Sequence, residues 1–119
     1  MKKYILILIT VFAFTAVQGQ EKSNSKIKET SFEVKGVCGE CKARIENAAM
    51  HTKGVKKADW NKETKELKLV YNSQKVDLET VKKAIASKGH DTDTQPTDST
   101  SYAKLPGCCK YKDGAKCGH

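Results

Sequence analysis

The chain has 119 residues, with 22 lysines and arginines against 14 acidic residues and a formal net charge of +8. This length suits one small domain and is too short for two domains with separate cores. The basic residues are interspersed with acids, as in 56–59 (KKAD) and 63–66 (ETKE), which is typical of a solvated surface. A nucleic-acid-binding surface concentrates basic residues and adds stacking aromatics, so nucleic acid is not expected as a partner.

Residues 1–19 have the features of a secretory signal peptide. Two lysines follow the initial Met, residues 4–17 form an apolar run, and small residues close it. The run is shorter than the roughly 20 residues that a transmembrane helix needs. We therefore expect cleavage near Gly19, export to the periplasm and no stable membrane insertion, with a retained anchor as the alternative. Residues 20–26 follow as a polar lead-in.

The next segments predict a strand followed by a helix. Apolar and polar residues alternate from residue 30 to residue 34, which predicts a half-buried strand. From residue 40 to residue 52 the apolar residues share one helical face: Cys41, Ile45, Ala48 and Ala49. This spacing predicts an amphipathic helix of about three turns. Gly54 ends it.

The second half of the domain predicts a hairpin of two strands, a second helix and a final strand. Residues 55–60 and 67–71 predict two further strands, and the short polar segment 61–65 joins them as a hairpin. Asp77 is a suitable N-cap for a second amphipathic helix, which a glycine ends. The apolar positions of that helix are Leu78, Val81, Ala84 and Ile85. Residues 90–95 predict a short edge strand.

The element order β-α-β-β-α-β predicts an α+β, ferredoxin-like sandwich over residues 27–95, with a four-stranded antiparallel sheet and two helices on one face. The predicted core comprises Phe32, Val34, Ile45, Leu67, Leu69, Val81 and Ile85. Residues 96–104 are rich in Thr, Ser and Asp and predict a linker. Residues 105–119 form a Cys/His-rich tail with too few apolar residues for a core of its own, so a metal, a disulfide or the main domain must order it.

Cys38 and Cys41 form a Cys-x-x-Cys motif at the predicted junction of the first strand and the first helix. The partial positive charge at a helix start favours thiolates over thiols there. Two thiolates at this spacing can reach one ion from opposite sides, and soft sulfur ligands select Cu(I) or Zn(II) over Mg²⁺ or Ca²⁺. A structural zinc site requires four ligands. The motif therefore predicts a soft-metal site, with Cu(I) as the first expectation.

These features together resemble the heavy-metal-associated domain family, which includes copper chaperones, the amino-terminal domains of copper-transporting P-type ATPases and the periplasmic mercury-binding protein. The resemblance covers residues 27–95. It rests on the Cys-x-x-Cys that opens a helix, on Ile45 four residues after the second cysteine, on the Gly-Val pair at 54–55 and on Gly-His-Asp at 89–91. The family usually has Met two residues before the first cysteine, where this chain has Gly36.

The resemblance implies the ferredoxin-like fold and assigns Cys38 and Cys41 as the metal ligands. It adds Hg(II) or Zn(II) as alternatives to Cu(I). It also places His90 where family members carry a residue, often Tyr, Lys or His, that approaches the metal loop. His90 is therefore a candidate third ligand or a group that tunes the thiolates, and the alternative is a solvent-facing residue at a helix exit. His51, on the helix far from the loop, is expected to be an ordinary surface residue.

Dithiol redox chemistry is the main rival for the Cys-x-x-Cys motif, because thioredoxins also place such a motif at a helix start. The chain lacks the Trp that precedes that motif and the Pro that follows its Gly. A structural disulfide between Cys38 and Cys41 is a further alternative. Metal binding is the preferred interpretation, and an exported protein could hold this pair as a disulfide until it is reduced or metallated.

The tail contains four further donors within twelve residues: Cys108, Cys109, Cys117 and His119. Four such donors could close a second zinc or copper site. A disulfide from Cys117 to one of the neighbouring cysteines is the alternative. A third hypothesis is that the tail thiols cap the main site or hand metal to it.

The sequence thus predicts an exported, monomeric metallochaperone or scavenger that passes its ion by ligand exchange. Its partner would be a metal-transporting or metal-accepting protein with exposed thiolates. No phosphate-binding loop, paired carboxylates in an apolar setting or Ser/His/Asp arrangement supports an enzyme. A periplasmic thiol-disulfide oxidoreductase and a module with a purely structural metal are the alternatives.

Overall fold

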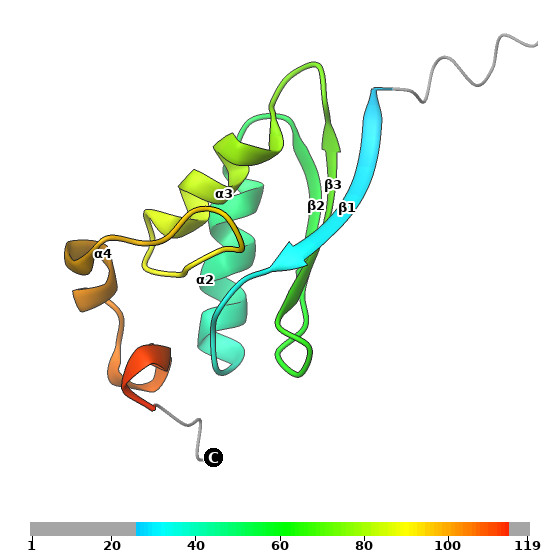
Figure 1. Cartoon of the computed structure of the whole chain (residues 1–119). Helices are drawn as coiled ribbons and strands as arrows, with labels where there is room; N and C mark the ends of the chain where they lie inside the picture. The colour runs from blue at the N-terminus through cyan, green and yellow to red at the C-terminus, as the bar shows by residue number, and fades with distance from the viewer. Residues whose placement is uncertain (1–25, 115–119) are drawn as a thin grey trace, which may run out of the picture.

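The computed structural model describes residues 26–114, which fold around an antiparallel sheet covered by helices (Figure 1). The main elements are β1 (Ile27–Glu33), α2 (Gly39–Met50), β2 (Val55–Trp60), β3 (Glu66–Asn72) and α3 (Leu78–Ala86). The sheet has the order β1-β3-β2 with antiparallel pairing throughout. Both α2 and α3 lie on one face of the sheet, as the sequence predicts. This is the expected α+β arrangement.

The core lies between this face of the sheet and the two helices. Leu67 on the central strand pairs with Phe32 on one side and with Trp60 on the other, and all three side chains are buried. The seven core residues predicted from the sequence are all buried. The N-cap of α3 is also as predicted, because the Asp77 carboxylate accepts a hydrogen bond of 2.8 Å from the backbone amide of Thr80.

The predicted fourth strand at residues 90–95 is wrong. Among the described residues this segment contributes one isolated bridge, between Val34 and Thr92. The physical reason is a tight turn: the amide of Thr92 donates to the carbonyl of Gln95 at 2.9 Å, and the Thr92 hydroxyl accepts from the Gln95 amide. Backbone groups used within this turn are not available to extend a ladder along β1.

The predicted linker at 96–104 contains a short helix, α4 (Ser99–Ala103). Asp98 caps it by accepting a 2.6 Å hydrogen bond from the amide of Ser101. The Thr, Ser and Asp residues that indicated a linker are therefore also good capping residues. Two 3-10 turns follow, η1 (Gly107–Cys109) and η2 (Tyr111–Asp113).

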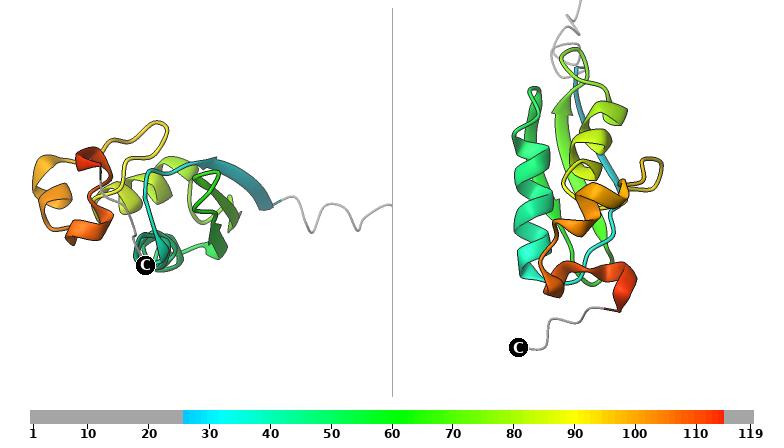
Figure 2. Two further views of the ribbon diagram at one scale, coloured as in Figure 1. Left: turned by 90° about the horizontal axis from the view of Figure 1, so that it is seen from below. Right: turned by 90° about the vertical axis from the view of Figure 1, so that its left-hand side faces the viewer.

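The tail folds back onto the main domain. The side chains of Leu105 and Cys109 are buried and belong to the same apolar cluster as the domain core. Both views of Figure 2 place η1 next to the end of α2 at which that helix begins. Docking on the main domain, one of the three ways of ordering the tail that the sequence left open, is seen for residues 105–114.

Within residues 26–114, no helix combines the length and the apolar character needed to cross a membrane. The predicted signal peptide at 1–19 and nearly all of the lead-in at 20–26 lie outside the described residues.

Candidate metal centre

The Cys-x-x-Cys motif lies where the sequence predicts, at the start of α2. Cys38 is the N-cap residue in an extended conformation, and its carbonyl accepts a 2.9 Å hydrogen bond from the amide of Lys42. Cys41 lies in the first turn of the helix. The side chains of both cysteines are buried, with 6% and 0% of their surfaces exposed. The positive end of the helix therefore faces two sulfurs that are shielded from water.

The side chain of Trp60 packs against the loop that carries the motif. Its indole Nε1 donates a 3.0 Å hydrogen bond to the carbonyl of Val34, and its ring lies directly under Gly36. A Cβ atom at residue 36 would be 3.0 Å from two ring carbons of Trp60 and 3.1 Å from Cβ of Cys41. The absence of a side chain at this position thus lets a large aromatic ring pack beneath the cysteine loop, where other members of the resembled family carry Met.

The tail brings two more thiols to the motif. The Sγ atoms of Cys38, Cys108 and Cys109 all lie within 4.8 Å of one another. Cys41 is not in this group, but its thiol influences Cys109, because it is among the causes that raise the pKa of the Cys109 thiol. Cysteines separated by about 70 residues in the chain therefore form one sulfur cluster.

Charged side chains of α2 contact the tail thiols. The Arg44 guanidinium donates a 3.2 Å hydrogen bond to Sγ of Cys109, and the Cys108 thiol donates one of 3.1 Å to the Glu40 carboxylate. Burial, and after it the hydrogen bond with Cys41, raises the pKa of the Cys109 thiol, while Arg44 acts in the opposite direction. The hydrogen bond to Glu40 is the largest cause that raises the pKa of Cys108. Metal binding at these thiols would consequently release protons.

The oxidation state differs among the cysteines. Cys41 and Cys109 are free thiols, whereas Cys38 is disulfide-bonded. A disulfide between Cys38 and Cys41 is therefore wrong as a description of this structure. The alternative disulfide from Cys117 to Cys108 or Cys109 involves a residue outside the described range and stays a prediction. Cys38 can act as a metal ligand only after reduction, because a thiolate and not a disulfide sulfur binds the ion.

His90 is fully buried, so the solvent-facing alternative is wrong. Its Nδ1 lies 2.7 Å from the carbonyl of Lys35, which can only accept, so Nδ1 carries the proton. Nε2 then has a free lone pair, and it has no hydrogen-bond partner among the described atoms. Burial lowers the pKa of His90 to about 4, which keeps the ring neutral at pH 7. His90 is not in the group of donors that lie within 4.8 Å of one another, and its role as a third ligand stays a prediction.

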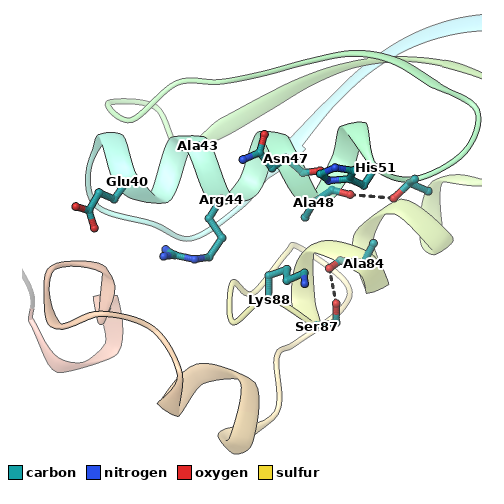
Figure 3. A pocket seen from close by; sticks show the side chains of 10 residues that line it. Glu40, Ala43, Arg44, Asn47, Ala48, His51, Ala84, Ser87 and Lys88 are labelled. Atoms are coloured by element: carbon teal, nitrogen blue, oxygen red, sulfur yellow. Dashed lines mark hydrogen bonds between the residues drawn. The ribbon is translucent and has the colours of Figure 1, made fainter.

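An open groove of about 790 Å³ lies between α2 and α3, next to the sulfur cluster and not over it. Figure 3 shows Arg44 of α2 and Lys88, in the turn that follows α3, extending into this space. No cysteine lines the groove. His51 is at its border, exposed and hydrogen-bonded to the carbonyl of Asn47, which confirms its assignment as a surface residue.

Sequence reasoning identified the cysteines but not the charged residues around them. Arg44 follows Cys41 by three residues and so shares its side of the helix, a signal that was available in the spacing. Glu40 lies within the motif itself. The two remaining predicted tail ligands, Cys117 and His119, lie outside the described residues.

A buried Cys-x-x-Cys at the start of the first helix of this α+β fold is the arrangement expected from the family resemblance. Residues 31–91 match the heavy-metal-associated domain family. The match covers half of the chain, and the protein belongs to this family. Residues 92–119, which include the docked tail, lie beyond it.

Several of the similar proteins are described as copper-binding proteins or copper chaperones. The chain is 37% identical over 54 residues to the copper chaperone CopZ of Staphylococcus aureus, which covers 45% of this chain and 79% of that protein. Among solved structures, a CopZ metallochaperone has 33% identity and a TM-score of 0.53, covering 55% of this chain and 98% of the other. A copper-binding domain from a P-type ATPase has 26% identity and a TM-score of 0.53, covering 55% and 89%. The comparisons therefore assign the protein to a family of heavy-metal-binding domains, with copper chaperones among its relatives.

Proposed function

We propose that the protein carries Cu(I) between the thiolates of Cys38 and Cys41 and passes it on by ligand exchange. The observation that carries this proposal is the pair of buried cysteine side chains at the positive end of α2 in a heavy-metal-associated domain. Soft thiolates prefer Cu(I) to hard ions, and two of the relatives named above are described as a copper chaperone and a metallochaperone. Hg(II) and Zn(II) are the competing ions, and a metal competition decides among them.

Transfer follows from the chemistry of two-coordinate thiolate complexes. A thiolate of the partner forms a bond to the ion and gives a three-coordinate intermediate. The bond to Cys38 or Cys41 then breaks, and the released thiolate takes up a proton from solvent. The ion keeps its oxidation state throughout. The disulfide at Cys38 must first be opened by a thiol reductant, which supplies two electrons and two protons per disulfide.

The partner is proposed to be a metal-transporting protein with exposed thiolates, such as a domain of a P-type ATPase. One similar structure is a copper-binding domain of such an ATPase, which supports this choice. We also propose that the protein is exported to the periplasm and is monomeric. Carriage of an ion requires no catalytic group, in agreement with family membership.

The test is a competition titration of reduced, full-length protein with a coloured Cu(I) chelator under anaerobic conditions. The double variant Cys38→Ser/Cys41→Ser should lose the wild-type affinity, and Lys104→Ser, an exposed position, should keep it. An unchanged affinity of the double variant would exclude the proposed site. Insulin reduction by the same preparations tests the oxidoreductase alternative, which requires activity that the double variant lacks.

A further inference from the structure

The tail outside the family match contributes two thiols that the Cys-x-x-Cys motif alone does not explain. Cys108 and Cys109 are brought to the motif by the fold, and the Sγ atoms of both lie within 4.8 Å of Sγ of Cys38. In a site that transfers its ion, additional sulfurs at this distance would compete with the partner's thiolates for coordination positions on the ion.

We propose that Cys108 and Cys109 join Cys38 and Cys41 as ligands of one soft metal ion, in a single site with at least three sulfur ligands. This inference rests on the proposed function. It makes the docked tail an internal cap that closes an otherwise two-coordinate transfer site, and the tail must move away before the ion can leave.

The distances suit this coordination. A metal–sulfur bond of about 2.3 Å places two sulfurs of one ion roughly 3.8 to 4.0 Å apart in tetrahedral or trigonal geometry. The three Sγ atoms already lie within 4.8 Å of one another, so contraction by about 1 Å, within reach of side-chain rotation, brings them to bonding positions. Cys41, three residues after Cys38 in the motif, is the fourth donor of the proposed site.

The tail is held in place by contacts that require no metal. The Tyr111 hydroxyl donates a 2.8 Å hydrogen bond to the carbonyl of Gly89 and accepts one of 2.9 Å from the amide of Asp91. The Tyr111 ring stacks on His90, with the ring centroids 5.7 Å apart. Leu105 packs against the backbone of Gly89. The thiols are therefore presented to the motif before any ion arrives, which reduces the ordering cost of binding.

The surrounding charge also fits. Three or four thiolates on a monovalent or divalent ion form a complex with net negative charge, and Arg44 already donates a hydrogen bond to Sγ of Cys109. A guanidinium at this position offsets part of that charge in a buried setting. Glu40, the carboxylate in contact with Cys108, is exposed, so repulsion from it is screened by water.

The first measurement needs no variant. X-ray absorption of the reduced, full-length protein loaded with one equivalent of Cu(I) should show at least three sulfur ligands. Two sulfur ligands in the wild type would overturn the proposal. In Cys108→Ser/Cys109→Ser the number should fall to two.

Affinity and release provide the second measurement. The double tail variant should bind one equivalent with an affinity lower by at least about tenfold, as expected for the loss of groups that hold a metal ion. It should also release Cu(I) to a chelator faster, while Lys104→Ser behaves as wild type. The half-buried Cys108 is also replaced alone by Ser, because replacing the buried Cys109 could loosen the tail. This single variant should likewise bind more weakly.

The outcomes separate the two proposals. Equal affinity and release rates in the wild type and in both tail variants would overturn the shared site and leave the Cys38 and Cys41 site intact. A stoichiometry lower by one in the double tail variant would also overturn it, because the tail would then hold an ion of its own. Failure of the proposed function would instead appear as unchanged affinity in Cys38→Ser/Cys41→Ser.

Discussion

Replacement of Leu105 by Ala should release the tail from the domain. Leu105 is 4% exposed, and a Cβ at residue 89 would lie 2.8 Å from its Cδ2, so its side chain packs directly on the Gly89 backbone. Leu→Ala in a core costs about 2 to 5 kcal/mol, and the lower part of this range, about 2 to 3 kcal/mol, applies near an edge that can relax. Since about 1.4 kcal/mol corresponds to a factor of ten, the open state should become roughly 30 to 150 times more populated.

The assay is the alkylation rate of Cys109 in reduced, metal-free protein, followed by peptide mass spectrometry. The Cys109 side chain is buried in the docked tail, so its labelling requires opening, and the rate should rise by the same factor when reclosing is fast. Ile27→Ala is the control, because Ile27 is exposed at the start of β1. An unchanged Cys109 rate in Leu105→Ala would refute the reasoning that burial of Leu105 holds the tail.

Two further predictions concern stability. Metal-free wild-type protein should lose stability as the pH falls from 6.5 to 4, because the unfolded chain takes up a proton at the ordinary histidine pKa of about 6.5, while burial lowers the pKa of folded His90 to about 4. In His90→Gln, the free energy of unfolding should fall less between pH 7 and pH 4.5, by up to about 3 kcal/mol, as measured by urea unfolding at the two pH values. An identical pH dependence in wild type and variant would contradict this prediction. Gly36→Ala should destabilise the protein by about 1 to 3 kcal/mol, because its Cβ would press on the Trp60 ring at 3.0 Å. Gly39→Ala is the matched comparison in thermal unfolding, since nothing lies within 4 Å of a Cβ there, and an equal loss in both variants would exclude the contact with Trp60 as the cause.

Local patterns predicted most of the fold. The period-two strands, the amphipathic helices and the Asp77 cap were readable because each depends on residues close in sequence, and the three strands and two helices confirm them. The prediction of an edge strand at 90–95 was wrong because the alternation of apolar and polar residues is weak there. The turn between Thr92 and Gln95 also uses backbone groups that a strand would need for pairing. Asp98 caps α4 in the segment that was expected to be a linker. A capping residue was visible in the sequence, but the Thr, Ser and Asp composition was interpreted as that of a linker.

The sequence by itself determined the family, the fold class and the position of the Cys-x-x-Cys motif at a helix start, because these follow from residue spacing within short segments. Only the tertiary structure decided the surroundings of the motif. It placed Trp60 under Gly36, buried His90, and docked Cys108 and Cys109 beside Cys38. These contacts join segments up to about 70 residues apart. They depend on how side chains such as Leu105 and Tyr111 fill space against α2 and the Gly89 turn, and periodicity along the chain carries no information on that packing.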